Sequence, residues 1–230
     1  MMLVSLLAYT PNPERFVASA AKLCYSSSGI SELALNLSDE DVNRILKKII
    51  KSRHYSALEH ASFTFGIEGI SRACSHQLVR HRIASYNQQS QRYVKYTSDA
   101  EYVIPENIET DEGAKKIFLD IWDAALTAYN KLISNGVSRE DARYVLPNAS
   151  TTKIIVTMNA RELLHFFELR TCLRAQWEIR GLAKKMLLLV RDICPTIFAD
   201  SGPSCFRGPC LEGDMRCDVP PKKETFFRDE

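Results

Sequence analysis

RHRIASYNQQSQRY, residues 80–93, is the stretch around which this chain is organised. It holds three arginines, one histidine, two serines, one asparagine and three glutamines, so its few apolar residues do not account for it. No acidic residue occurs from Gly69 to Ser98, although the whole chain has 30 basic and 28 acidic residues. Because a guanidinium group matches the oxygens of a phosphate with two parallel hydrogen bonds, this local positive charge predicts a binding loop for a phosphate-bearing ligand.

The same stretch resembles a known family signature. Its pattern of Arg-His-Arg, Ser85, Asn87, Ser90 and Arg92-Tyr93 is similar to the signature of the flavin-dependent thymidylate synthases. The resemblance extends to residues 54–60 and 159–170, and it covers the chain to about Pro195. It implies an α+β fold with a mixed sheet and long helices, assembled as a homotetramer whose active sites are shared between subunits.

The resemblance also implies an activity, the reductive methylation of dUMP to dTMP. In this family 5,10-methylenetetrahydrofolate supplies the carbon, FAD reduced by NADPH supplies the hydride, and tetrahydrofolate is released. An arginine cannot act as a base at neutral pH, so Arg170 is predicted to stabilise negative charge on the N3/O2 side of the pyrimidine. Cys172 follows closely in the sequence, so attack by a thiolate on the pyrimidine stays an open alternative.

The family pattern assigns the remaining site residues. The residues predicted to bind dUMP are Gln77, Arg80, Gln88, Gln89, Ser90, Gln91, Arg92, Arg143 and Arg170. Those predicted to bind FAD are Ser56, Arg80, His81, Arg82, Gln88, Asn159, Arg161 and His165. Gln88 stands where some relatives have a glutamate, and His165 stands where some have an asparagine. No metal site is assigned.

Two other classes of function compete with this interpretation. One is a nucleic-acid-binding domain that uses the arginines for phosphate contacts and the tyrosines for stacking, namely Arg80, Arg82, Arg92, Tyr86 and Tyr93. The other is a zinc-stabilised interaction module built on the cysteines near the C-terminal end, Cys205, Cys210 and Cys217, with Cys194. Neither a Gly-x-Gly-x-x-Gly motif nor a Walker loop occurs, so the usual nucleotide-binding loops are not indicated.

Length and composition bound the possibilities. With 230 residues and 45% apolar content the chain can bury a proper core, and we expect a catalytic domain over residues 1–199 and a Cys/Gly/Pro-rich tail over residues 200–230. A net charge of +2 argues against a broad nucleic-acid-binding surface. An odd count of seven cysteines, the lack of a signal-peptide pattern and the absence of a long apolar run predict a cytoplasmic protein without a membrane partner.

Periodicity, caps and breakers predict the elements. Strands are expected over residues 2–9, 61–68 and 151–158, and helices over residues 13–23, 70–79, 110–135 and 175–194. Ser38, Ser138 and Asn159 are each predicted to cap a further helix, and Glu162 is expected to reach back to the cap at Asn159. Residues 54–60 are predicted as a loop and residues 93–104 as extended chain. The expected apolar stripes are Phe16, Ala20 and Leu23 on the first helix, and Ile117, Phe118, Ile121, Ala125, Ala128, Tyr129 and Ile133 on the long one.

Overall fold

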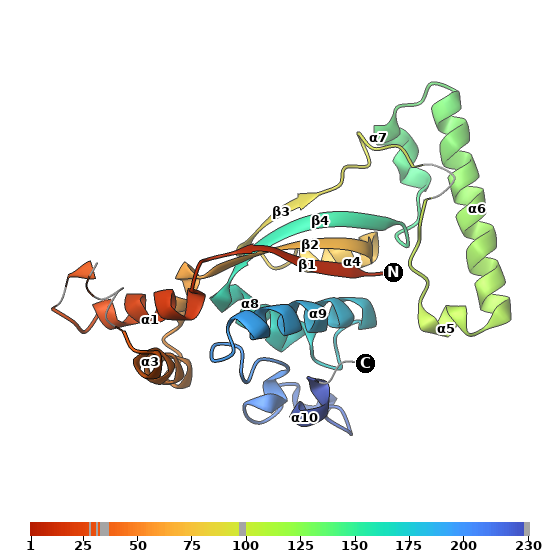
Figure 1. Ribbon diagram of the computed structural model, residues 1–230. Helices are drawn as coiled ribbons and strands as arrows, with labels where there is room; N and C mark the ends of the chain where they lie inside the picture. The colour runs from red at the N-terminus through yellow and green to blue at the C-terminus, as the bar shows by residue number, and fades with distance from the viewer. Residues whose placement is uncertain (28, 31, 33–36, 97–99, 228–230) are drawn as a thin grey trace. The chain divides into compact units, whose positions relative to one another are not determined.

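The structure is a computed structural model that describes residues 1–27, 29–30, 32, 37–96 and 100–227 (Figure 1). Its strands are β1 (Leu3–Tyr9), β2 (Ser62–Ser71), β3 (Ala84–Gln88) and β4 (Thr151–Asn159). Its longer helices are α1 (Pro13–Leu23), α3 (Asp39–Lys51), α4 (Arg72–Leu78), α6 (Glu112–Ser134), α8 (Ala160–Arg170) and α9 (Trp177–Ile193). Short helical segments are η1 (Tyr55–His60), α5 (Glu106–Glu109), α7 (Arg139–Ala142), η2 (Arg143–Val145), η3 (Ser204–Phe206), η4 (Gly213–Met215) and α10 (Lys223–Phe226).

The four strands form one sheet in the order β1-β2-β4-β3. Thr64 of β2 bonds to Thr157 of β4 at 2.9 Å, and Glu68 bonds to Lys153 at 2.8 Å, so β4 runs backwards along β2. The amide of Gln89, just after β3, donates to the Lys153 carbonyl at 2.9 Å, and His81, before β3, contacts Glu162, after β4, so β3 runs antiparallel to β4. The predicted α+β class is confirmed, but the sheet is antiparallel where a mixed sheet was expected.

The chain divides into two compact units, each built from three segments. Unit 1 comprises Met1–Leu3, Ile67–Arg80 and Asn87–Ile155, and unit 2 comprises Val4–Gly66, His81–Tyr86 and Val156–Glu230. The dividing points fall inside the polar stretch, between Arg80 and His81 and again between Tyr86 and Asn87. The stretch therefore contributes residues to both units.

In unit 1 the long helix α6 packs through aromatic side chains. The Tyr102 ring lies 5.3 Å from Phe118 and 5.0 Å from Trp122 between ring centroids, and Trp122 and Tyr129 are the buried residues of the helix. The predicted stripe was wrong in part, because Ile117 and Ile121 are 67% and 61% exposed. Periodicity gives the apolar residues of a helix, but the neighbouring chain decides which of them are covered.

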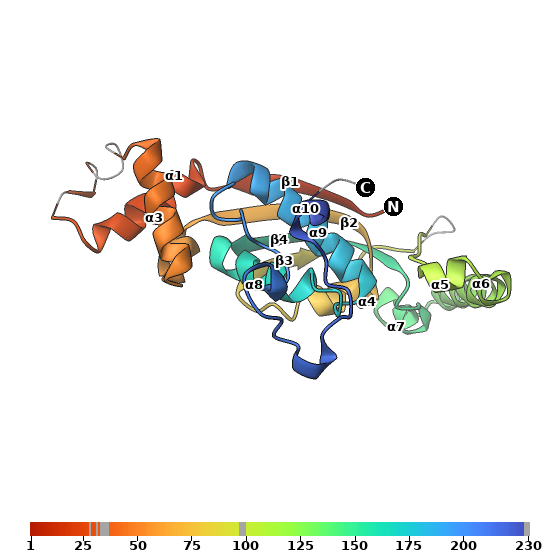
Figure 2. The ribbon, with the colours of Figure 1, turned by 90° about the horizontal axis from the view of Figure 1, so that it is seen from below.

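In unit 2 the core lies between strand residues and two helices. The Phe198 ring meets Phe63 of β2 and Phe167 of α8 edge to face, with both centroid distances 5.9 Å. Helices α8 and α9 lie on one face of the strands of this unit (Figure 2). Burial of such large aromatic side chains supplies much of the free energy that holds these elements together.

The first helix of unit 2 differs from expectation in its buried face. Helix α1 spans the predicted residues, but it buries Val17, Ala18 and Ala21, whereas Phe16 is about half exposed. The Phe16 ring instead meets the His60 ring of η1 edge to face. Residues 55–60 form this short 3₁₀ helix rather than the predicted loop.

The segment after Ala199 is folded against unit 2. Phe206 packs against Phe226 and Phe227 at centroid distances of 5.2 and 6.1 Å, and the Arg191 guanidinium of α9 lies 3.8 Å from the Phe227 ring centroid. Gly202 has a positive φ of 143°, and a Cβ there would lie 2.5 Å from the Phe206 ring. The predicted boundary at residue 199 stays a prediction, and residues 228–230 of the expected tail lie outside the described part.

Residues 93–104, predicted as extended, include residues 97–99, which lie outside the described part. Tyr102 makes an antiparallel bridge with Ser150, in keeping with extended chain at that point. Within the residues that the structure describes, no helix combines the length and the apolar character needed to cross a bilayer.

Candidate active site

The polar stretch begins beyond α4, forms β3 and ends in a tight turn. The Ser90 carbonyl accepts from the amides of Tyr93 and Val94 at 3.3 and 3.0 Å, and its hydroxyl accepts from the Arg92 amide at 3.2 Å. A serine that bonds the backbone two residues on is a frequent turn-former. Ser90 therefore sets the path of the loop, and its role in binding dUMP stays a prediction.

Gln88 is held in unit 1 by two buried hydroxyl groups. Its Nε2 donates to Ser75 Oγ at 2.9 Å and to Thr152 Oγ1 at 3.1 Å, and Ser75 Oγ donates in turn to the Arg72 carbonyl at 2.9 Å. The orientation of the Gln88 amide is fixed because Ser75 Oγ already donates its hydrogen to Arg72 and can therefore only accept from Gln88. Ser75 and Thr152 were missed by sequence reasoning, since a serine in a helix and a threonine in a strand carry no local signal.

Arg92 and Arg143 converge on Glu140 of α7. Arg92 Nε and Nη2 each lie 2.8 Å from Glu140 Oε2, and Arg143 Nε donates to the Glu140 carbonyl at 3.0 Å. Arg92 and Glu140 are 48% and 49% exposed, so this is a surface ion pair. Glu140 is a third partner that the sequence does not reveal, because it lies in the first turn of the helix that begins at Ser138. The predicted cap of Ser138, on the Asp141 amide, is confirmed.

The other predicted dUMP residues of unit 1 surround the same loop. Gln91 Nε2 donates to Tyr96 Oη at 3.2 Å, and Tyr96 Oη donates to the Thr151 carbonyl at 2.8 Å. Gln89 is tied by its backbone amide to β4. Gln77 is half-buried on α4, and Arg80 is exposed two residues after the helix ends.

In unit 2, three side chains form a chain of hydrogen bonds centred on His81. Arg170 Nε donates to His81 Nε2 at 3.0 Å, and His81 Nδ1 lies 3.1 Å from Glu162 Oε1. Since Arg170 can only donate, Nε2 must carry a lone pair, and the proton lies on Nδ1 facing the Glu162 carboxylate. The His81 and Glu162 side chains are 4% and 6% exposed, so the arrangement is shielded from water.

The electrostatics support a neutral imidazole. Burial, together with the nearby Arg170 and His165, lowers the pKa of His81 to about 4. Burial raises the pKa of Glu162, while His165 opposes that shift. The Tyr86 hydroxyl donates to the His81 carbonyl at 2.7 Å, and burial followed by the Glu162 charge raises the pKa of Tyr86. At neutral pH His81 is therefore a neutral imidazole, and it stands between the Glu162 carboxyl group and the Arg170 guanidinium.

Helix α8 supplies most of this cluster. Asn159 Oδ1 accepts from the Glu162 amide at 2.9 Å, which confirms the predicted cap. The expected return bond of Glu162 to the cap is wrong, because its carboxylate faces His81 instead. The exposed His165 ring lies 5.9 Å from the His81 ring between centroids.

An ion pair joins α8 to η1. Arg161 on the first turn of α8 pairs with Glu59, and Ser56 lies on the same 3₁₀ helix. The predicted FAD residues Ser56, Arg161 and His165 are all exposed, as is Arg82 after His81. Unit 2 therefore presents several cationic and donor side chains at its surface.

The predicted site residues are divided between the two units. Unit 1 contains Gln77, Arg80, Gln88, Gln89, Ser90, Gln91, Arg92 and Arg143. Unit 2 contains Ser56, His81, Arg82, Asn159, Arg161, His165 and Arg170. Within unit 1, Arg92 and Arg143 meet at Glu140, and within unit 2, His81 meets Arg170 and His165. No pattern in the sequence predicts this division.

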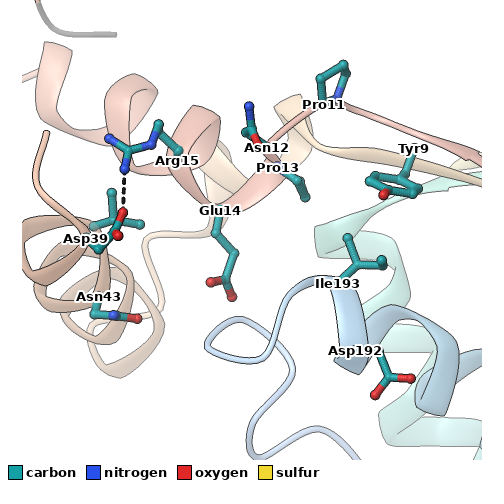
Figure 3. A pocket seen from close by; sticks show the side chains of 11 residues that line it. Tyr9, Pro11, Asn12, Pro13, Glu14, Arg15, Asp39, Asn43, Asp192 and Ile193 are labelled. Atoms are coloured by element: carbon teal, nitrogen blue, oxygen red, sulfur yellow. Dashed lines mark hydrogen bonds and ion pairs between the residues drawn. The ribbon is translucent and has the colours of Figure 1, made fainter. Parts of the chain in front are cut away.

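Each unit contains a hollow among its described residues. The one in unit 2, of about 630 Å³, is lined by α1, α3 and the end of α9, and it contains none of the predicted site residues (Figure 3). Its Glu14 accepts from the Thr196 and Ile197 amides at 2.6 and 2.9 Å, and its Arg15 pairs with Asp39. The hollow in unit 1, of about 560 Å³, includes Gln89 of the polar stretch.

The cysteines of the alternative zinc module lie in different surroundings. Cys194 is buried in the core, where burial raises its pKa. The pKa of Cys205 is raised mainly by burial and also by the nearby Cys210, Cys217 and Cys172, so Cys194 is not among the cysteines that act on it. In the part of the chain that the structure describes, no three histidine, cysteine or acidic side chains are grouped to hold a metal ion.

Comparison with known proteins adds to this geometry. The family model described as thymidylate synthase complementing protein matches residues 5–196. A flavin-dependent thymidylate synthase of Geobacter sulfurreducens is 57% identical over 229 residues, covering 99% of each chain. The enzymes of the same name from Clostridium tetani and Pyrococcus furiosus are 53% and 47% identical, covering 93% and 94% of this chain and 92% and 91% of their own. The chain therefore belongs to the thymidylate synthase complementing protein family.

Proposed function

We propose that this protein is a flavin-dependent thymidylate synthase that converts dUMP to dTMP. The observation that carries the proposal is the hydrogen bond between Arg170 and His81, because His81 is a buried neutral histidine that belongs to the family signature. The names of the relatives support the same activity. The substrates would be dUMP, 5,10-methylenetetrahydrofolate and NADPH.

The arginines of unit 1 suit the phosphate of dUMP. A surface ion pair such as that of Arg92 with Glu140 contributes about 0–1 kcal/mol, so a phosphate dianion can replace the carboxylate at little cost. Arg143, bonded to the same residue through its backbone carbonyl, would join it. We assign Gln77, Arg80, Gln88, Gln89, Ser90 and Gln91 to the rest of the nucleotide.

Arg170 suits the pyrimidine. Its bond to His81 uses Nε, so the terminal nitrogens Nη1 and Nη2 are the groups that can face a ligand. A neutral acceptor orients the guanidinium without cancelling its charge. Arg170 would therefore stabilise the negative charge that develops on the uracil ring as C5 becomes a nucleophile.

The exposed donors of unit 2 fit a flavin dinucleotide. FAD carries a diphosphate, and Arg82 and Arg161 are exposed guanidinium groups, while Asn159 uses only its oxygen for the helix cap and keeps its NH₂ group for a ligand. Ser56, His81 and His165 complete the proposed FAD set in unit 2, and Arg80 and Gln88, which belong to unit 1, are also assigned to FAD. When bound, reduced FAD supplies the hydride for the methyl group.

Assembly and location follow as further proposals. Ile117 and Ile121 leave an apolar strip on α6 that fits a subunit contact, which supports a homotetramer with shared active sites. Seven reduced cysteines agree with a cytoplasmic location, where thiols stay unpaired. The catalytic domain would comprise residues 1–199.

An anaerobic absorbance experiment tests the function. Purified protein is loaded with FAD, and bleaching of the flavin by NADPH is followed with and without dUMP. We expect reduction to respond to dUMP, and dTMP to form when methylenetetrahydrofolate is added. Failure to bind flavin, together with salt-sensitive binding of an oligonucleotide, would instead favour the nucleic-acid-binding alternative.

A further inference from the structure

Glu162 is a buried carboxylate with no role assigned by the family signature. It lies in the first turn of α8, and its side chain, 6% exposed, faces His81 Nδ1 at 3.1 Å. Burying a carboxylate costs several kcal/mol unless it is hydrogen bonded to a suitable partner. The chain retains this cost at a residue that touches the histidine of its polar stretch.

The consequence of the contact reaches Arg170. An imidazole with its proton on Nδ1 offers a lone pair at Nε2, and Arg170 Nε donates to that atom at 3.0 Å. With the other tautomer, two N–H groups would face each other and the bond would be lost. The Glu162 carboxylate favours the tautomer that holds Arg170.

The arrangement also separates charges. A carboxylate bonded directly to Arg170 would draw the guanidinium toward itself and offset its charge at the ligand. Here the neutral His81 stands between the two, so Glu162 fixes the direction of Arg170 from two hydrogen bonds away. This is the geometry in which a buried acid orients a cation while leaving its charge available for catalysis.

Neighbouring residues hold Glu162 and His81 in place. The Asn159 cap fixes the first turn of α8 through the Glu162 amide at 2.9 Å. The Phe166 ring meets the His81 ring edge to face at a centroid distance of 4.8 Å and an angle of 84°. The Tyr86 hydroxyl holds the His81 carbonyl. The His81 ring itself is contacted by Phe166, Glu162 and Arg170, while the Asn159 cap and Tyr86 hold the backbone on either side of the His81–Glu162 contact.

We propose that Glu162 is a positioning residue for dUMP methylation, which holds His81 as the Nδ1–H tautomer and thereby fixes the guanidinium of Arg170. The proposal rests on the proposed function for its kinetic part. Its structural part concerns the ligand-free protein and can be tested without any activity.

The structural test is nitrogen NMR of histidine-labelled, ligand-free protein, with the His81 signals assigned from the H81N variant. In the unaltered protein we expect a protonated Nδ1 and an unprotonated Nε2. In the Glu162→Leu variant, where no acceptor faces Nδ1, we expect the two tautomers to mix and the Nδ1 proton to exchange faster. The Glu162→Gln variant should retain the tautomer, because its amide oxygen can still accept.

The kinetic test uses the same variants with a control on the same helix. Glu168→Gln removes a carboxylate of α8 that pairs with Arg207 and does not touch His81. We expect E162L to lower kcat by about 100-fold, since small misplacements of a catalytic group have effects of this order, with a much smaller change in the Kd for dUMP. E162Q should lose only several-fold, and E168Q should match the unaltered protein.

The outcomes separate the two claims. Unchanged tautomer and unchanged kcat in E162L would overturn the proposal, and so would a loss of kcat without a change of tautomer. If E162L does not fold, E162Q decides: an upfield shift of the Nδ1 proton with a several-fold lower kcat supports the proposal, and no change in either overturns it. If the unaltered protein forms no dTMP, the proposed function fails, while the NMR result still decides whether Glu162 sets the tautomer of His81.

Discussion

Arg92 and Arg170 are both assigned to the nucleotide, but the protein holds them in opposite ways. Arg92, in unit 1, is half exposed and shares its charge with the half-exposed Glu140. Arg170, in unit 2, is held through one nitrogen by a buried neutral imidazole. The first arginine has a counter-ion that it can exchange for a phosphate, and the second has a full charge with a fixed direction. The difference teaches that binding and stabilisation of developing charge need different supports.

The largest expected effect comes from removing the fixed charge. Arg170→Ala should keep bound flavin and lower kcat for dTMP formation by about 100- to 1,000-fold, as for the loss of one preorganised electrostatic group. Arg174→Ala is the matched control, because Arg174 lies on the surface near Met215 Sδ at 3.9 Å. If R170A kept its turnover, Arg170 would not stabilise the negative charge on the pyrimidine, and it would not differ from Arg92 in function.

Acid should lower the free energy of unfolding because the imidazole of His81 is buried. The pKa of His81 is lowered from its ordinary value of 6.5 to about 4, so between these pH values the unfolded chain binds a proton that the folded chain does not. The free energy of unfolding should therefore fall as the pH drops from 6.5 to 4, by up to about 3 kcal/mol from this group. Glu162, whose pKa is raised by burial, takes up a proton earlier in the folded state and offsets part of this loss.

Urea unfolding at several pH values measures this effect. The H81N variant has no titrating group at this position, so its free energy of unfolding should depend less steeply on pH in that range. Equal slopes for H81N and the unaltered protein would show that the buried imidazole does not set the acid sensitivity.

A smaller effect is expected from the exchangeable charge. Arg92→Ala should raise the Kd for dUMP by about tenfold, the value of one charge-assisted contact, with little change in kcat. Glu140→Gln should lower the same Kd by a few-fold, because Arg92 no longer has to leave a carboxylate. Calorimetric titration with dUMP checks both, and an equal weakening by both changes would mean that Glu140 supports the arginine instead of competing for it.

The smallest expected effect concerns Gln88. Replacing it by Glu removes two donors, and Ser75 Oγ already donates its hydrogen to the Arg72 carbonyl. We expect Gln88→Glu to lower the free energy of unfolding by about 1–2 kcal/mol, the cost of imperfectly paired buried hydroxyl groups. Gln89→Glu is the control, since Gln89 is tied to β4 through its backbone. Equal stability of the two variants would show that the hydroxyl pair adapts freely.

Local features of the fold could be predicted from the sequence, and long-range ones could not. The caps at Ser38, Ser138 and Asn159 were confirmed because each is a hydrogen bond to an amide three residues on. Which apolar residues are buried was wrong for Phe16 and Ile117, since that depends on chain brought in from elsewhere.

The same limit applies to the site. The arginines and the histidine of the polar stretch can be recognised in the sequence, and the family signature predicts their roles. The partners of these residues carry no such mark: Glu162 is 81 residues from His81, and Thr152 is 64 residues from Gln88. The Glu162 carboxyl group, predicted to bond back to the helix cap at Asn159, faces His81 instead, and only the tertiary structure shows this.

Gly202 has a consequence for how the end of the chain behaves as a whole. The Phe206 ring occupies the space where a side chain at residue 202 would begin, and that ring contacts Phe226 and Phe227, one of which lies on Arg191 of α9. Displacing one ring disturbs all three, so the last segment should detach in one cooperative step rather than fray residue by residue. A protease would then meet this segment either fully docked or fully released, and cleavage after Gly202→Ala would begin at many sites at once.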